Sequence, residues 1–175
     1  METKKVYIIL TYTGTILSRI IRLFTRAKYA HVSISLDKKL NRMYSFGRIN
    51  PYIAFWGGFV HENMNWGTFK RFKNTKAIIY SIDVTQEQYN KIEELIEYFI
   101  KNKKQFHFNV LGTFLSGFEI KYKKKNKFYC SEFVKYILDE AKVETNLNDI
   151  VKPIDFLNIK QKEIIYKGLL RNYKG

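Results

Sequence analysis

The stretch YAHVSISL, residues 29–36, alternates apolar and polar side chains along its whole length. Successive side chains of an extended chain point to opposite faces, so positions 32, 34 and 36 form an apolar face and positions 31, 33 and 35 a polar one. A turn-forming segment at 37–41 follows, and then a segment at 42–46 that is typical of a returning strand. The pattern therefore predicts a β-hairpin with His31 at the start of its first strand, facing away from the core.

Strand and helix patterns continue on both sides of this hairpin. Residues 6–13 predict a first strand that stops at Gly14, and residues 15–26 have the apolar spacing of an amphipathic helix. The other expected segments are an extended loop at 47–75, an alternating strand at 76–84, a helix from Thr85 to about Asn102 with a Thr85–Gln88 capping box, a helix at 109–119, a helix from Cys130, a turn or short helix at Pro153, and a strand or helix at 163–170.

The composition indicates a folded, strongly basic chain. Of 175 residues, 46% are hydrophobic and 17% are aromatic, which is enough apolar area to offset the chain entropy of one core. We therefore expect a single domain over residues 1–175. The net charge of +15 is expected to attract nucleic acid, anionic lipid or acidic polymers. Alternatively, the basic composition reflects coding bias alone.

The apolar run near the N-terminus predicts neither a signal peptide nor a membrane span. Residues 6–10 are apolar, but polar residues at 11–13 interrupt the run and no small-residue cleavage site follows. No apolar stretch approaches the roughly 18 residues that a membrane span needs. A single cysteine also rules out an internal disulfide. We expect a cytoplasmic protein on these grounds.

Cys130 is the main candidate for a nucleophile. It stands at the predicted start of a helix, where unpaired N–H groups and the positive end of the helix dipole favour a thiolate. The same N–H groups can stabilise the oxyanion of a tetrahedral intermediate. The alternative is an inert core cysteine, because Cys130 shares a helical face with Val134 and Ile137.

A cysteine nucleophile needs a base, and the chain offers three histidines. His31 is favoured, because its position on the polar face of a strand allows its ring to point into a cleft. His61 lies in the predicted loop and is interpreted as solvated, whereas His107 is interpreted as a histidine at an element boundary. Histidines scattered this widely do not predict a metal site. No cofactor is expected either.

Two segments resemble the signatures of a known family. YAHVSISL at 29–36 and FYCSEFV at 128–134 are similar to the histidine and cysteine segments of the circularly permuted NlpC-type, papain-like hydrolases. That group includes YiiX-type proteins and relatives of lecithin retinol acyltransferase. Ordinary papain-like enzymes place the cysteine first, whereas here His31 precedes Cys130, as the permutation implies. The resemblance spans residues 6–140 and implies an α+β fold, with a small, mainly antiparallel sheet or partial barrel packed against helices.

The resemblance also implies a third polar residue that orients the imidazole from the strand after the histidine strand. By position this residue is Ser45. A serine hydroxyl accepts a hydrogen bond but carries no charge, so it stabilises an imidazolium less than a carboxylate does. Two alternatives stay open. Either Glu62 reaches in from the predicted loop, or catalysis is impaired and the fold serves binding.

These features together predict a cysteine hydrolase or acyltransferase with Cys130 as nucleophile, His31 as base and Ser45 as the orienting residue. The substrate would be a peptide or a lipid-linked amide, ester or thioester. The alternative function is a non-catalytic basic module that binds nucleic acid or an anionic membrane through the lysine-rich run at 121–127. Weak contact with polyanions or an anionic membrane is also compatible with an enzyme.

Overall fold

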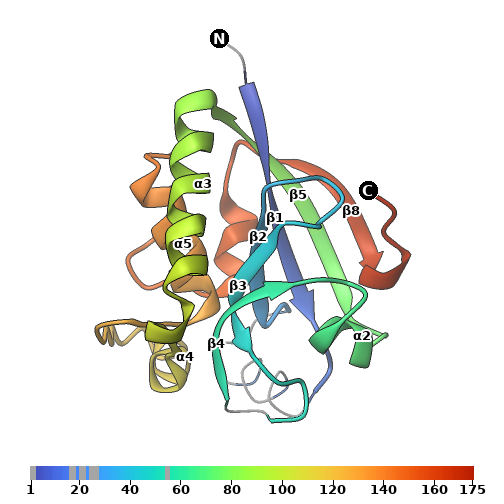
Figure 1. Ribbon diagram of the computed structural model, residues 1–175, viewed down its shortest axis with the longest axis vertical. Coiled ribbons are helices and arrows are strands. Elements are labelled where there is room, and N and C mark those ends of the chain that lie inside the picture. The colour runs from blue at the N-terminus through green and yellow to red at the C-terminus, as the bar shows by residue number, and fades with distance from the viewer. Residues whose placement is uncertain (1–2, 16–18, 20–22, 24–27, 54–55) are drawn as a thin grey trace.

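The computed structural model describes residues 3–15, 19, 23, 28–53 and 56–175. The described strands form one open, curved sheet in the order β7-β6-β4-β3-β2-β1-β5-β8 (Figure 1). Their bounds are β1 Thr3–Tyr12, β2 His31–Ser35, β3 Met43–Arg48, β4 Gly57–Glu62, β5 Lys76–Thr85, β6 His107–Phe108, β7 Lys127–Phe128 and β8 Glu163–Leu169. Neighbouring strands pair antiparallel, except β6 with β7. Together with the helices, this sheet confirms the predicted α+β class.

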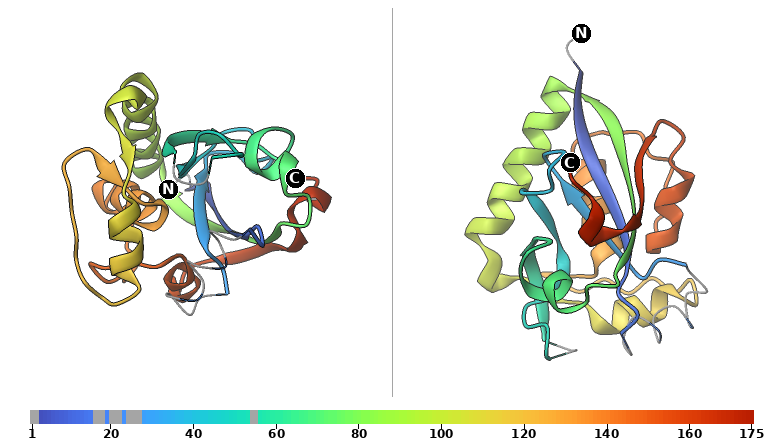
Figure 2. Two further views of the ribbon diagram at one scale, coloured as in Figure 1. Left: turned by 90° about the horizontal axis from the view of Figure 1, so that it is seen from below. Right: turned by 90° about the vertical axis from the view of Figure 1, so that its right-hand side faces the viewer.

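Two helices, α3 (Gln86–Lys101) and α5 (Cys130–Glu140), cover one face of the sheet (Figure 2). α3 begins with the predicted capping box, in which Thr85 and Gln88 each accept a backbone N–H of the other through their side chains. The main core lies between the helices and the sheet, and its fully buried members include Ile8, Ile34, Phe46, Tyr80, Ile96, Phe99, Phe133 and Ile137. Burial of these side chains fixes α5 against the central strands.

A second, smaller core covers the opposite face of the sheet. It contains Tyr7, Ile9, Leu40, Met43, Phe69, Ala77, Ile79, Leu170 and Tyr173. Phe69 comes from α2 (Gly67–Arg71), and Leu170 comes from the 3-10 helix η3 (Leu170–Asn172). Because both faces are covered, Ser33 and Ser35 on the polar face of β2 are fully buried. The polar face of this strand therefore lies inside the molecule.

Most predicted segments form the expected elements, with bounds that differ by a few residues. Residues 163–170, predicted as a strand or a helix, form strand β8. The segment near Pro153 forms the 3-10 helix η2 (Pro153–Asn158), a further 3-10 helix, η1, spans Lys103–Gln105, and the segment at 109–119 forms α4 (Val110–Ser116). The predicted helix at 15–26 lies largely outside the described residues.

The predicted extended loop at 47–75 is wrong in part. It contains β4, which pairs with β3 from Met43↔Glu62 to Arg48↔Gly57, and it contains α2. The glycines that suggest a loop instead permit close packing. A Cβ atom at Gly57 would lie 2.7 Å from the carbonyl oxygen of Gly47 and 2.9 Å from the Cβ of Phe108. Glycine inside a strand marks such a close approach of neighbouring atoms.

Within the described residues, no helix combines the length and the apolar character that crossing a bilayer requires.

Candidate functional site

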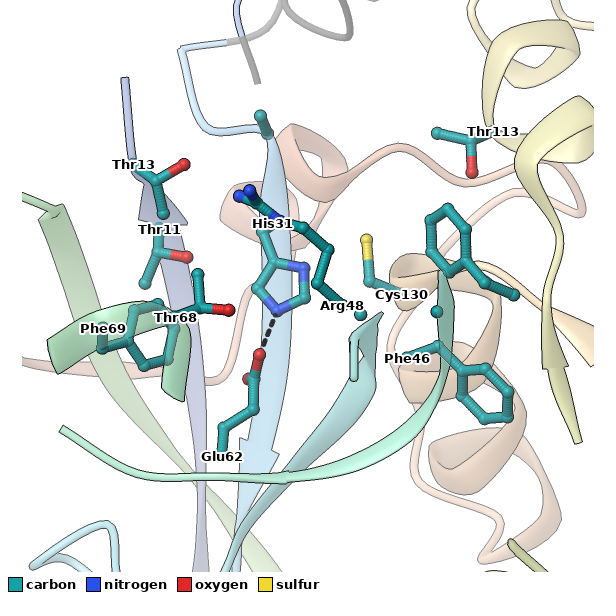
Figure 3. A pocket seen from close by; sticks show the side chains of 14 residues that line it. Thr11, Thr13, His31, Phe46, Arg48, Glu62, Thr68, Phe69, Thr113 and Cys130 are labelled. Carbon is teal, nitrogen blue, oxygen red and sulfur yellow. Dashed lines mark hydrogen bonds and ion pairs between the residues drawn. The ribbon is translucent and has the colours of Figure 1, made fainter. Parts of the chain in front are cut away.

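The candidate site lies where β2 and β3 separate. These strands pair at Ile34↔Tyr44 and Ser35↔Met43, although β2 begins at His31 and β3 extends to Arg48. Helix α5 contacts both strands, and its first residue, Cys130, lines the opening between them (Figure 3). A cavity of about 70 Å³ occupies the opening, and its lining residues include Thr11, His31, Phe46, Arg48, Glu62, Phe108 and Cys130.

Cys130 has the helix position that the sequence predicts. Tyr129 is the N-cap residue of α5 and makes no side-chain cap. The first hydrogen bond of the helix runs from the Phe133 N–H to the Tyr129 carbonyl at 3.0 Å. In this geometry the N–H groups of the first turn, from Cys130 onward, have no carbonyl partner within the helix. They form a positively polarised end beside the sulfur, suited to a developing oxyanion.

Ser131, the residue after Cys130, anchors the start of α5. Ser131 is fully buried, and its hydroxyl donates to the carbonyl oxygen of Val151 at 2.8 Å. Phe133 and Val134, a half-turn later, are also fully buried in the main core. Cys130, itself buried, therefore begins a helix whose first turn is packed into the main core and hydrogen-bonded to Val151.

His31 is held by a carboxylate from the next strand but one. Its Nε2 lies 2.9 Å from Oε1 of Glu62. A carboxylate only accepts, so the ring donates its Nε2–H and leaves Nδ1 for another partner. The Ser33 hydroxyl donates to the second oxygen of Glu62. In Figure 3 the other ring nitrogen of His31 is on the side of the ring nearer the Cys130 sulfur.

Gly47 makes this contact between β2 and β4 possible. β3 lies between the two strands in the sheet, so the side chains of His31 and Glu62 must meet over it. A Cβ atom at position 47 would lie 3.4 Å from Cε1 of His31 and 3.5 Å from Oε1 of Glu62. A methyl group would just fit there, but a branched side chain would occupy the space of the pair. Small size at this position therefore permits the His–Glu contact.

The pKa of His31 is raised to about 10. Burial of the ring lowers this pKa, because it penalises the charged form, but the charge of Glu62 and hydrogen bonding with Cys130 and Glu62 raise it by more. The ring is therefore an imidazolium at neutral pH in this environment. An imidazolium between a carboxylate and a thiol is suited to hold the proton that the thiol releases.

The prediction that Ser45 orients the imidazole is wrong in its geometry. The Ser45 hydroxyl is fully buried and donates to the backbone carbonyl of Val32 at 2.6 Å. It thus joins β3 to β2 at the position where the regular pairing stops. Glu62, one of the alternatives from the sequence, occupies the orienting position instead. It comes from the last residue of a strand, and not from a loop.

The other two histidines do not join the site. His61 is exposed, stacks on Tyr44, and donates from Nε2 to the Asn41 carbonyl at 2.6 Å. His107 is exposed in β6. In the described part of the chain, no group of three His, Cys, Asp or Glu side chains is arranged to hold a metal ion.

Comparison with known proteins supports the fold. No protein-family model matches the sequence, and no curated protein matches it significantly. A solved structure, that of the metalloprotein yiiX from Escherichia coli O157:H7, matches with a TM-score of 0.53 and 15% sequence identity. The match covers 94% of this chain and 97% of yiiX. The chain therefore shares the yiiX fold over most of its length, in agreement with the YiiX-type resemblance of its two segments.

Sequence patterns alone do not mark two contributors to the site. Gly47 and Arg48 fall in the predicted loop at 47–75. In the structure they are the last two residues of β3. Arg48 lines the cavity beside Cys130 and carries no motif that marks it. In β4, Phe59 lies on the core side. The pairing of Gly47 with Gly58 places Glu62 on the same face of the sheet as Gly47.

The lysine-rich run precedes the cysteine helix, as expected. Lys123, Lys124 and Lys125 are exposed, and Lys121 forms an ion pair with Asp149 at 2.6 Å. None of these lysines lines the cavity at Cys130. The basic surface and the candidate site are therefore separate features of the molecule.

Proposed function

We propose that this protein is a cysteine hydrolase or acyltransferase that uses Cys130, His31 and Glu62. The observation that carries the proposal is the convergence of these residues, from α5, β2 and β4, on one cavity. The thiol stands at a helix start, and the imidazole is fixed by a carboxylate at 2.9 Å. These are the nucleophile, base and orienting group that acyl transfer requires.

In the proposed reaction, Cys130 and His31 start as a thiolate–imidazolium pair, in which Nδ1 of His31 already holds the thiol proton, and the thiolate attacks the carbonyl carbon of an amide, ester or thioester. A carbon–sulfur bond forms, and the carbonyl electron pair moves to oxygen. The N–H groups at the start of α5 stabilise this oxyanion. As the intermediate collapses, the bond to the leaving group breaks, and the leaving group takes the proton from His31.

The second half of the reaction releases the acyl group. Water or an acceptor nucleophile gives its proton to His31 and attacks the thioester carbon. The carbon–sulfur bond then breaks, and the Cys130 thiolate is restored beside the protonated His31 ring. Glu62 keeps the ring oriented and stabilises its charge throughout both halves. Transfer replaces hydrolysis where the acceptor excludes water from the opening.

The resemblance to permuted NlpC-type, papain-like hydrolases supports this proposal, as does the shared fold with yiiX. The yiiX protein itself is called a metalloprotein. In the described residues of the present chain, the side chains do not form a metal-binding group. The proposed steps use the thiol, imidazole, carboxylate and backbone N–H groups that the site brings together.

The size and lining of the cavity indicate which part of a substrate would lie inside it. The cavity of about 70 Å³ beside Cys130 is small, so we expect it to hold the reacting carbonyl group while the rest of a peptide or lipid-linked substrate extends outside. Thr11 contributes a fully buried hydroxyl to the lining, and its Oγ1 has no hydrogen-bond partner among the described residues. A substrate polar atom or a water molecule would satisfy this group.

Acylation by an activated ester tests the proposal directly. p-Nitrophenyl acetate should transfer one acetyl group to Cys130, seen by intact-mass and peptide mass spectrometry, with release of nitrophenol in a burst. Cys130→Ser should abolish the burst, and His31→Ala should slow it strongly. Acetylation spread over surface lysines, with Cys130 unmodified in the folded protein, would contradict the proposed function.

A further inference from the structure

The cavity contains a cation that the proposed acyl transfer does not use. Arg48 is the last residue of β3, and its side chain extends into the cavity that His31 and Cys130 line (Figure 3). Its Nη2 donates to the Thr15 hydroxyl at 3.3 Å, and its Cζ lies 5.2 Å from the centre of the Phe72 ring. The guanidinium is therefore held in position by a ring and a hydroxyl.

A second guanidinium stands on the same ring. Arg71, the last residue of α2, places its Cζ 5.4 Å from the centre of Phe72 and 3.8 Å from the centre of Tyr52. Cation–π contacts of this kind hold an arginine without neutralising its charge. The guanidinium groups of Arg48, which lines the cavity, and Arg71 thus both lie against the Phe72 ring.

Neither charge has an anionic partner in the described part of the chain. No carboxylate among those residues lies within 4.0 Å of either guanidinium. Arg42, by contrast, forms an ion pair with Glu93 at 2.6 Å. Burial and then the charge of Arg71 lower the pKa of Arg48, and the charge of Glu62 opposes them. Glu62 is already bonded to His31 and Ser33.

Arg48 is partly buried and Arg71 is exposed. The two cations repel one another, and an anion bound beside Arg48 offsets that repulsion. Arginine presents five donors in a fork that matches the oxygens of a carboxylate or phosphate. We propose that Arg48, supported by the charge of Arg71, is an anion subsite that binds a carboxylate or phosphate group of the substrate close to the acyl carbon attacked by Cys130. This inference rests on the proposed function and narrows its substrates to anionic acyl compounds.

Two alkylating reagents of nearly equal size test the subsite without knowledge of the substrate. Iodoacetate carries a carboxylate, whereas iodoacetamide is neutral, and both react with a thiolate. The rate of iodoacetate reaction at Cys130, divided by the rate of iodoacetamide reaction, therefore reports the preference of the cavity for an anion. Arg48→Gln should lower this ratio about threefold to tenfold, the range expected for one unit charge in a partly solvated cavity. Arg71→Gln should lower it less, and Arg48→Lys should largely retain it.

Arg42→Gln is the matched control. It removes one positive charge from a side chain that pairs with Glu93 and does not line the cavity, so the ratio should stay at the wild-type value. Circular dichroism checks that each variant is folded. An equal ratio in wild type and folded Arg48→Gln would overturn the subsite.

Protection experiments identify the source of the anion. Inorganic phosphate and acetate are added separately at constant ionic strength, and the rate of iodoacetamide reaction at Cys130 is measured. Slowing by phosphate alone assigns a phosphate group, slowing by acetate alone assigns a carboxylate, and slowing by both assigns a subsite open to either. In each case Arg48→Gln should abolish the protection. Protection by neither anion would overturn the subsite.

The same alkylation experiments distinguish a failure of this inference from a failure of the proposed function. Fast iodoacetamide reaction at Cys130, with no effect of Arg48→Gln on the ratio, would remove the subsite and leave the acyl-transfer proposal standing. A Cys130 that reacts with neither reagent in the folded protein would remove both.

Discussion

Replacing Glu62 with glutamine tests the electrostatic centre of the site. Glu62→Gln keeps a hydrogen-bond acceptor near Nε2 of His31 and removes the negative charge 2.9 Å away. An opposite charge at close range raises a histidine pKa by about one to three units. The two side chains are only 21% and 10% exposed, so solvent screens the pair little and the effect should be near the upper end of that range.

The pKa of His31 should therefore fall from about 10 by about two to three units. The measurement is an NMR titration of the His31 ring protons in both proteins. Glu93→Gln is the control, because it removes a carboxylate that pairs with Arg42 and should leave the His31 titration unchanged. An unchanged midpoint in Glu62→Gln would refute the assignment of Glu62 as the partner that charges the ring.

The same variant has a stability signature with a defined sign. The pKa of His31 is about 10 in the folded protein and about 6.5 in the unfolded chain. The interactions of His31 with Glu62 and Cys130 therefore stabilise the fold fully below about pH 6.5, provided that Glu62 is ionised, and this stabilisation is lost as the pH rises through about 10. The loss of unfolding free energy in Glu62→Gln should shrink across this interval. A loss of unfolding free energy in Glu62→Gln that does not change with pH would contradict this linkage.

Three further changes test the supporting residues. Ser45→Ala should cost about 1–2 kcal/mol of stability through the lost hydrogen bond to Val32. It should reduce the rate of the p-nitrophenyl acetate burst much less than His31→Ala does. Equal reductions of the burst rate would mean that Ser45 acts in the reaction. Gly47→Ala should keep that burst near normal, whereas Gly47→Val should slow it by displacing the His–Glu pair; identical rates in the two variants would contradict the role of Gly47. Neutralising the lysines at 123–125 should weaken salt-sensitive polyanion binding in a filter assay while leaving the burst unchanged; a lost burst in the folded protein would place these lysines in the site.

The sequence is most informative where local chemistry decides the structure. The alternation around Ile34, the cap at Thr85 and the apolar stripe after Cys130 each depend on neighbours within a few residues. The corresponding elements form as predicted. Local patterns of this kind remain visible without knowledge of the fold, which is why the sequence predicts the hairpin and the cysteine helix.

The third residue of the site depends instead on how strands are ordered in the sheet. Ser45 follows the histidine strand directly, but its hydroxyl completes the backbone bonding of β2. Glu62 reaches His31 from one strand further away, because Gly47 leaves the space over β3 open. Neither the strand character of residues 57–62 nor this open space follows from local spacing, since glycines favour a loop in isolation.

Alkylation of Cys130 by iodoacetamide at about pH 7 tests the central claim most directly. The site as built, with a helix start and the His31 ring beside the sulfur, predicts that folded Cys130 reacts faster than a model thiol and that His31→Ala slows the reaction. A Cys130 that stays unmodified in the folded protein and reacts only after denaturation would contradict the account, because it would show a buried core cysteine in place of a nucleophile.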